Sequence, residues 1–218
     1  MCSELAIIRV VDVLQLGPTP YREALALQHK LRERRREDLI PDTVVALEHP
    51  PVYTRGRRSE PGELPFGEDW YAERGIEIVD VDRGGKVTYH GPGQLVLYPI
   101  CRVDDVKAFV CRLERAMVAA LAAEGIQARG RSSEGIQYTG AWVEDRKIGS
   151  IGLHVSHGVT THGLSLNVDC DLEPFSWIVP CGLPEALVTS IQAERPDRPA
   201  DLPRVRASLL DALGAPVA

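Results

Sequence analysis

The stretch RGGKVTYHGPGQLVLYPI, residues 83–100, says more about the fold than any other part of the chain. Residues 87–89 and 95–98 carry side chains that strands favour. Glycine and proline at positions 91–93 separate these two runs, so the pattern predicts strands joined by a turn where a ligand can approach the main chain closely. With His90 beside the turn this is the layout of an active site. A hairpin whose turns simply need glycine is the alternative.

Length and composition are those of a globular protein. The chain has 218 residues, of which 44% are hydrophobic and 26% charged, which favours one domain covering residues 1–218 and argues against a disordered or membrane-spanning chain. Arg9 and Asp12 interrupt the N-terminal apolar run, so no secretory signal is predicted and a cytoplasmic location is expected. The net charge of −6 offers no overall field for nucleic acid, so neither nucleic acid nor a membrane is a predicted partner.

Two arginine clusters, at residues 32–36 and 55–58, are positively charged although the net charge of the chain is negative. Either cluster could steer an acidic protein toward the chain. Solvated arginines at a helix end and on a loop are the alternative interpretation.

Hydrophobic periodicity predicts a mixture of helices and strands. Helices are predicted from Tyr21 to about Glu37 with Thr19 as N-cap, from about Asp105 to Glu124, and behind an Asp201 cap near the C-terminus. Residues 50–67 are predicted as a long irregular loop. Strands are predicted at residues 5–13, 43–47, 76–81, 87–89, 94–100, 136–138, 141–144, 147–155, 159–162 and 164–169. This order predicts the α+β class, with helices packed against an antiparallel or mixed sheet.

Two side chains have settings typical of reactive groups. Cys181 lies in IVPCGLP, residues 178–184, where two prolines and a glycine predict a tight turn that presents the thiol; an inert, half-buried thiol is the alternative. Lys147 begins KIGSIGL, residues 147–153, whose glycines leave little bulk beside it. A partly buried lysine there can lose its proton and serve as a general base, whereas an ordinary surface lysine at a strand start is the other interpretation.

No metal site and no cofactor are predicted. His154, His157 and His162 lie near Cys170 in the sequence, but no paired cysteines and no helical histidine pair accompany them. In a strand, His154 and His157 would also point to opposite faces. The chain contains neither a GxxxxGK(S/T) phosphate loop nor a GxGxxG turn after the first strand.

Six segments, taken together, resemble the octanoyltransferase family of lipoate biosynthesis. They are EHPPVYTRGRR at 48–58, RGGKVTYHGPGQLVLYPI at 83–100, RKIGSIGLHV at 146–155, THGLSLNV at 161–168, PCGL at 180–183 and TSI at 189–191. The resemblance covers most of the chain. It implies the fold of the catalytic domains of biotin and lipoate protein ligases, a mixed β-sheet flanked by helices with a smaller antiparallel sheet beside it.

The resemblance also implies a reaction and its residues. Octanoyl would pass from octanoyl-acyl carrier protein to a lysine of a lipoyl domain, with the lipoyl domains of 2-oxoacid dehydrogenase complexes and the glycine cleavage H protein as acceptors. Cys181 matches the acyl-accepting thiol of the family, and Lys147 matches its partner base. Three segments match its acyl-substrate contacts: Arg83, Gly84, Gly85, Lys86, Val87, Thr88, Tyr89 and His90; Ser150, Ile151 and Gly152; and Gly163, Leu164 and Ser165.

Two other functions stay open at this stage. An ATP-dependent lipoate or biotin protein ligase on the same scaffold would use Lys147 to contact an acyl-adenylate and would leave Cys181 structural, so a requirement for ATP distinguishes it. A non-catalytic module that binds a carrier protein or a lipid would instead use the arginine clusters.

Overall fold

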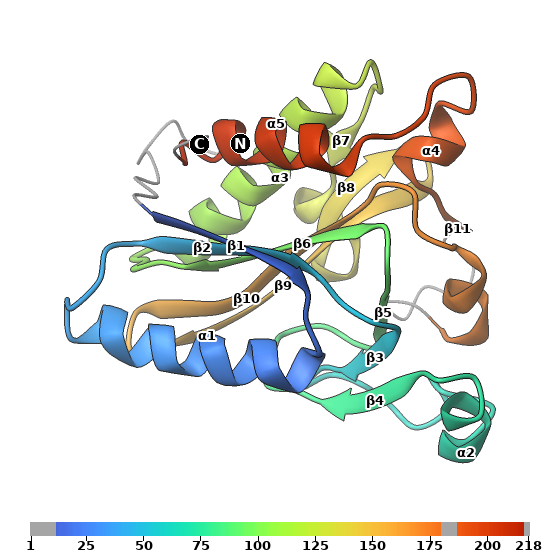
Figure 1. The fold of residues 1–218 in the computed structure, drawn as a ribbon, viewed down its shortest axis with the longest axis horizontal. Helices are drawn as coiled ribbons and strands as arrows, with labels where there is room; N and C mark the ends of the chain where they lie inside the picture. Colours follow the sequence, from blue (N-terminus) through green and yellow to red (C-terminus); the bar gives the residue numbers. More distant parts are fainter. Residues whose placement is uncertain (1–11, 180–186, 216–218) are drawn as a thin grey trace.

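The computed structural model describes residues 12–179 and 187–215. Most of its strands form one large sheet, and three others form a smaller sheet beside it (Figure 1). The strands of the larger sheet are β1 (Asp12–Pro18), β2 (Thr43–Glu48), β6 (Gln94–Ile100), β7 (Arg129–Gly130), β8 (Gly140–Val143), β9 (Arg146–Ser156), β10 (Val159–Asn167) and β11 (Leu187–Val188). Those of the smaller sheet are β3 (Val52–Arg55), β4 (Glu77–Asp80) and β5 (Thr88–His90).

The larger sheet has the strand order β1–β2–β6–β10–β9–β8–β7, and β11 pairs with β9 off this path. β1 runs parallel to β2 and β11 parallel to β9, whereas the other neighbours are antiparallel. The predicted α+β class, with a large mixed sheet and a smaller sheet, is confirmed. The expectation that the smaller sheet is antiparallel is wrong: this sheet is mixed, because β3 pairs parallel with β4 and antiparallel with β5.

Helices cover both faces of the larger sheet (Figure 1). Helix α1 (Tyr21–Arg36) lies on one face, and α3 (Val106–Ala123) and α5 (Leu202–Ala212) lie on the other. Side chains of β2 and β6 alternate between the two cores, so Val45 and Val96 pack toward α1 while Val44 and Leu95 pack toward α3. The short helical elements are α2 (Glu68–Ala72), α4 (Ile191–Glu194), η1 (Ser132–Glu134), η2 (Ile136–Tyr138) and η3 (Glu173–Trp177).

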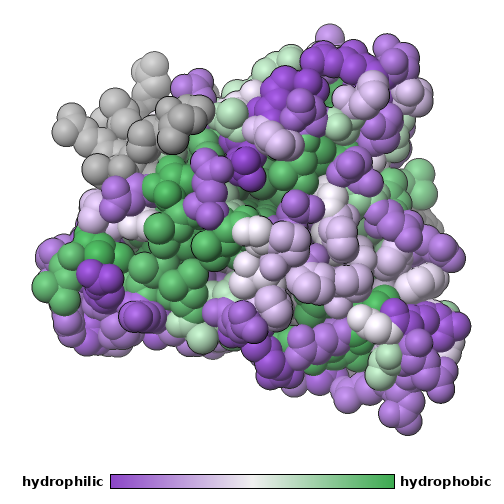
Figure 2. Space-filling view, viewed as in Figure 1, coloured by the Kyte–Doolittle hydropathy of each residue, from purple (hydrophilic) through white to green (hydrophobic). Residues whose placement is uncertain are grey.

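The surface seen from this side is divided. Hydrophilic residues cover the area around α2, whereas hydrophobic residues show between α1 and α5, around the edge of the larger sheet (Figure 2). In the described part of the chain, no helix combines the length and the apolar character needed to cross a bilayer.

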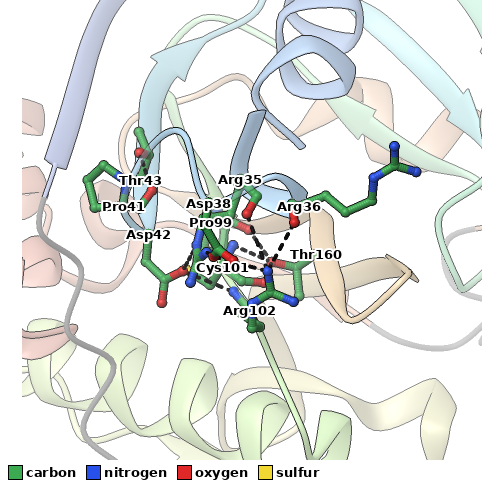
Figure 3. Close-up of polar contacts among 10 residues, drawn as sticks. All are labelled: Arg35, Arg36, Asp38, Pro41, Asp42, Thr43, Pro99, Cys101, Arg102 and Thr160. Carbon is green, nitrogen blue, oxygen red and sulfur yellow. Dashed lines mark hydrogen bonds and ion pairs between the residues drawn. The ribbon is translucent and has the colours of Figure 1, made fainter. Parts of the chain in front are cut away.

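Arg102 and Asp42 tie the C-terminal end of α1 to the sheet (Figure 3). Nη2 of Arg102 donates to the main-chain oxygens of Arg35 (3.5 Å) and Arg36 (3.2 Å), which belong to a helix end that lacks internal partners. Oδ1 of Asp42 accepts hydrogen bonds from the main-chain N–H of Arg102 (3.0 Å) and from Nε of Arg35 (2.6 Å). The position of α1 on the sheet is therefore fixed at the end opposite Tyr21.

Several helices and strands of the structure differ in bounds or type from those that the sequence predicts. Residues 136–138 form the 3-10 helix η2 and not a strand, and the predicted loop at 50–67 contains β3. Of the strand predicted at 5–13 only its last two residues are described, and β1 continues from them to Pro18. Helix α1 has Pro20 at its N-cap position, while the hydroxyl of Thr19 donates to the oxygen of Gly17 (2.9 Å).

The two strands predicted on either side of Gly163 are one strand, β10. A Cβ at this position would collide with the main-chain oxygen of Leu97 in β6. Gly163 therefore permits close packing of two strands and does not end either of them.

We expect Arg102→Ala to lower the free energy of unfolding by about 1 kcal/mol, because the last carbonyl groups of α1 lose a charged donor at a half-exposed site. Urea unfolding measures this change. Arg34→Ala is the matched control, since Arg34 is exposed in the same last turn and makes no side-chain hydrogen bond or ion pair with any described residue. Equal unfolding midpoints for the two variants would show that Arg102 does not stabilise the helix.

Candidate active site

A cavity of about 210 Å³ lies between the larger sheet, the start of α1 and the segment that leads into β5. Lys147 lines it, and so does every residue that the family resemblance predicts as an acyl contact except Val87 and Tyr89. Side chains alternate along this segment, so Thr88 and His90 face the cavity while Val87 and Tyr89 are buried in the aromatic cluster of the smaller sheet. The structure thus brings three distant predicted segments to one place.

Alternation also divides the predicted contacts at residues 150–152 and 163–165 between the two faces of the larger sheet. Ile151 and Leu164 pack in the core on the α3 side, so only their main chain borders the cavity. Ser150 pairs with Ser165, and Gly152 pairs with Gly163, across β9 and β10. These two pairs form adjacent rows on the floor of the cavity.

Lys147 reaches the cavity because of a β-bulge. The pairing of β8 with β9 shifts by one position beside Lys147. Ile148 and Gly149 consequently both face α3: Ile148 belongs to that core, and a Cβ on Gly149 would lie 2.7 Å from Sδ of Met117. The shift places Lys147, only 7% exposed, on the same face as Ser150.

The surroundings of Lys147 fix its side chain. Gly140 has a φ of +138°, and a Cβ there would lie 3.1 Å from Cε of Lys147. The ammonium nitrogen lies 5.4 Å from the centre of the Trp142 ring, whose Nε1 donates to the oxygen of Tyr138 (2.7 Å). The main-chain oxygen of Lys147 accepts a hydrogen bond from the N–H of Thr189 (3.0 Å). The strand β11, which follows Cys181 in the sequence, therefore lies beside Lys147.

Cys181 itself lies outside the described residues, and its role as the acyl-accepting thiol stays a prediction. Two described cysteines are unsuited to that role. Burial raises the pKa of the Cys170 thiol to about 12 and the pKa of the Cys101 thiol further still. Neither thiol forms the nucleophilic thiolate near neutral pH.

His162 reaches the cavity through a second irregularity. Alternation would place it on the α3 side with Leu164, but its φ is +57° and its side chain contacts Tyr21 of α1. Nε2 of His162 donates to Oδ1 of Asp82 (2.7 Å), and Nδ1 accepts from the hydroxyl of Tyr21 (3.2 Å). Burial lowers the pKa of His162, so the ring is neutral at pH 7, and its hydrogen bond holds the pKa of Asp82 well below the usual range.

Two more buried histidines stand near the cavity. Nδ1 of His49 donates to the oxygen of Thr19 (2.7 Å), so Nε2 accepts from the hydroxyl of Tyr98 (2.7 Å). Nδ1 of His90 donates to Oε1 of Gln94 (2.5 Å). Burial lowers the pKa of His49 to about 4 and the pKa of His90 to about 3. Both rings are therefore uncharged at neutral pH.

The segment 83–86 covers the cavity where it crosses β9. The N–H of Gly84 donates to the oxygen of Leu153 (2.9 Å), and a Cβ on Gly152 would lie 3.1 Å from Cδ of Arg83. Gly152 is therefore required by the protein's own main chain and side chains. Arg83 is buried and donates from Nη2 to the main-chain oxygen of Thr54 (2.7 Å), which holds the cover to the smaller sheet.

Sequence patterns do not point to several residues of the cavity wall. His162 directly precedes the predicted Gly163, and Tyr98 lies inside the stretch 83–100. Both are therefore close in the sequence to segments that are predicted to contact the substrate. Tyr21 comes from a helix 141 positions away from its partner His162, and no local pattern connects the two.

Within residues 12–179 and 187–215, no three His, Cys, Asp or Glu side chains are grouped to hold a metal ion.

Residues 20–214 match the model of the lipoyl protein ligase A/B catalytic domain family. The octanoyltransferase of Dictyoglomus thermophilum is 47% identical, over 80% of this chain and 73% of that protein. The octanoyltransferase of Mycolicibacterium smegmatis is 45% identical, over 93% of this chain and 89% of that protein. A crystal structure of lipoate-protein ligase A bound with ATP has a TM-score of 0.73 at 18% identity, covering 94% of this chain and 86% of that one.

The chain therefore belongs to the lipoyl protein ligase A/B catalytic domain family. The extent of its identity to octanoyltransferases places it in the octanoyltransferase branch of that family. The likeness to the ligase, at 18% identity, shows the shared fold alone.

Gly140→Ala should reduce transferase activity by about 100-fold, because displacement of a reacting group by about 1 Å can cost that much, and should lower the free energy of unfolding by about 1–3 kcal/mol through overpacking. Gly62→Ala is the control: Gly62 also has a positive φ, of +93°, but a Cβ there meets nothing within 4 Å. Both variants carry the backbone cost of alanine at positive φ, so the difference between them reports the collision of a Cβ at position 140 with the main-chain oxygen of Gly149 together with its contact with Lys147. Equal activity in the two would contradict the proposed packing.

Proposed function

We propose that the protein transfers an octanoyl group from a thioester donor to the side-chain amine of a lysine in a lipoyl domain, by way of a thioester on Cys181. The observation that carries this proposal is the position of Lys147. Because of a β-bulge, the side chain of this lysine points into a cavity of about 210 Å³. The strand that follows Cys181 lies beside it. The identity to octanoyltransferases supports the choice of acyl group.

In the first half-reaction, the thiolate Sγ of Cys181 attacks the carbonyl carbon of the octanoyl thioester. The bond from that carbon to the donor sulfur then breaks, and the donor leaves as a thiol after taking up a proton from the Lys147 ammonium, which becomes a neutral amine. The product is octanoyl-Cys181. A free thiol, with a pKa of about 8.5, is only partly ionised at neutral pH, so a nearby cation such as the Lys147 ammonium favours the reactive thiolate.

In the second half-reaction, the acceptor amine attacks the carbonyl carbon of octanoyl-Cys181, and the bond from carbon to Sγ breaks. The acceptor ammonium, with a pKa of about 10.4, must first lose a proton. It loses this proton to solvent, and as the amine attacks, the neutral Lys147 receives a second proton from the nitrogen and passes it to Sγ when the thiolate leaves. Amide formation from a thioester needs no ATP.

The cavity suits a hydrocarbon chain, and we call it the acyl slot from here on. Its nearby histidines are neutral at pH 7 and its floor is formed by glycine and serine pairs. Each methylene group buried there contributes about 0.8 kcal/mol to binding.

Family membership implies a lipoyl-domain protein as the acceptor. We propose octanoyl-acyl carrier protein as the donor and the lipoyl domains of 2-oxoacid dehydrogenase complexes and the glycine cleavage H protein as acceptors. The exposed Arg57 and Arg58 are candidate contacts for an acidic donor, because Arg58 lines the slot and neither makes an ion pair with a described residue. A cytoplasmic location remains part of this proposal.

A second candidate function is ATP-dependent ligation, because a protein of the same fold is a lipoate-protein ligase bound with ATP. The two functions differ in a single assay. Octanoyl transfer from the carrier thioester proceeds at the same rate with and without ATP, whereas a ligase makes no amide from free octanoate unless ATP is present.

Incubation of the protein with octanoyl-acyl carrier protein should add one octanoyl group to the intact protein, and Cys181→Ala should abolish this addition. Intact mass spectrometry measures it, and hydroxylamine should remove the group because it is a thioester. Cys170→Ala is the matched control and should retain the adduct, since the Cys170 thiol does not ionise near neutral pH. An adduct that persists in Cys181→Ala would refute the role of Cys181.

Lys147→Arg should reduce the rate of amide formation by roughly 100- to 10,000-fold, because a guanidinium group stays charged and cannot act as a base. The protein should still fold, which far-UV circular dichroism checks. Lys107→Arg, at an exposed position of α3, is the control for the substitution itself. Transfer by Lys147→Arg at the wild-type rate would remove Lys147 from the mechanism.

A further inference from the structure

We infer that Tyr21, held in place by His162, closes the far end of the acyl slot and sets the longest acyl chain that the enzyme transfers. The inference rests on the proposed function, because it takes the slot as the site of the acyl chain. We call Tyr21, Tyr98 and His162 the end wall. All three line the slot.

Strand register places the end wall away from Lys147. The row formed by Ser150 and Ser165 comes first, and the row formed by Gly152 and Gly163 is two positions further along β9. With a rise of about 3.3 Å per residue, and one position taken up by the bulge, Gly152 lies roughly 13 Å along the strand from Lys147. His162, next to Gly163, stands beyond that row. A chain attached near Lys147 therefore extends toward the end wall.

The rows leave space for a chain until the end wall is reached. Gly152 and Gly163 line the slot without side chains of their own, and Arg83 of the cover lies over Gly152, so the slot is narrow at this row. Beyond it the ring of Tyr21 is only 2% exposed and lies 5.0 Å from the ring of His49 and 6.1 Å from the ring of His90. An additional methylene group would have to displace a ring that is packed on several sides.

Hydrogen bonds hold the end wall in one position. The hydroxyl of Tyr21 donates to Nδ1 of His162, and Nε2 of His162 donates to Asp82. The hydroxyl of Tyr98 donates to Nε2 of His49. Because these groups bond to one another, the wall can meet a hydrocarbon chain without leaving a polar group unpaired.

The backbone of His162 indicates that its side chain is placed at some cost. A φ of +57° is uncommon for a residue other than glycine, and it turns the ring away from the α3 core toward Tyr21. Backbone strain of this kind persists where the surrounding structure requires it, and it is concentrated at functional sites. Here the strained backbone places the ring of His162 where it accepts the hydrogen bond that positions the Tyr21 ring.

The experiment compares kcat/KM for carriers loaded with octanoyl, decanoyl and dodecanoyl groups. For Tyr21→Ala we expect the ratio of decanoyl to octanoyl transfer to rise by at least about tenfold, since one or two methylene groups in a closed apolar site are discriminated by that factor or more. Tyr21→Leu should shift the ratio in the same direction by less, and it serves if the alanine variant does not fold. Tyr21→Phe retains the ring but loses the hydrogen bond to His162, so the ratio should rise by less than in Tyr21→Ala.

Tyr53→Phe is a matched control, because Tyr53 is also buried and loses one hydrogen bond, from its hydroxyl to the oxygen of Pro174, outside the slot. Its ratio should equal that of the wild type. An unchanged ratio in Tyr21→Ala and Tyr21→Leu variants that fold and still transfer octanoyl would overturn the inference. Absence of octanoyl transfer by the wild-type protein would instead refute the proposed function.

Discussion

Side chains alternate along β9 and β10, and the site depends on two places where this alternation is broken. In regular strands, Lys147 would point into the α3 core and His162 would join Leu164 on the same side. A bulge in β9 moves the side chain of Lys147 to the opposite face of the sheet, and a positive φ in β10 does the same for the side chain of His162. The two reversals bring the amine of Lys147 and the neutral ring of His162 to the lining of one cavity. Between them, Gly152 and Gly163 allow the cover and the neighbouring strand to pack closely around the cavity.

Burial then determines the charge of the site. The pKa values of His49, His90 and His162 are all lowered by desolvation, so the rings form hydrogen bonds as neutral partners at physiological pH. The guanidinium of Arg83 donates to Thr54 and Gly84 and thereby holds the cover of the slot. The histidine rings around the slot are thus uncharged, which suits the acyl chain that we propose as its occupant.

Local patterns of strand-like and helical residues predict the class of fold, and the resemblance to a known family predicts most of the cavity. It predicts that residues 83–90 approach a ligand, and alternation alone would have separated Thr88 and His90 from Val87 and Tyr89. The sequence does not predict the bulge beside Lys147 or the backbone of His162, because both depend on pairing with other strands. Tyr21 is missed for the same reason, since only the packing of α1 on the sheet brings it to the slot. The mixed pairing of the smaller sheet likewise follows from long-range contacts.

The central claim is that the acyl group rests on Cys181 and passes from there to the acceptor. Isolated octanoyl-enzyme, mixed rapidly with a lipoyl domain in the absence of donor and quenched at intervals, tests this claim most directly. The account predicts that the amide forms at a rate constant no smaller than kcat of the complete reaction, with loss of the octanoyl-enzyme in parallel. Amide formation much slower than kcat would show that the thioester is not on the reaction path and would contradict the account.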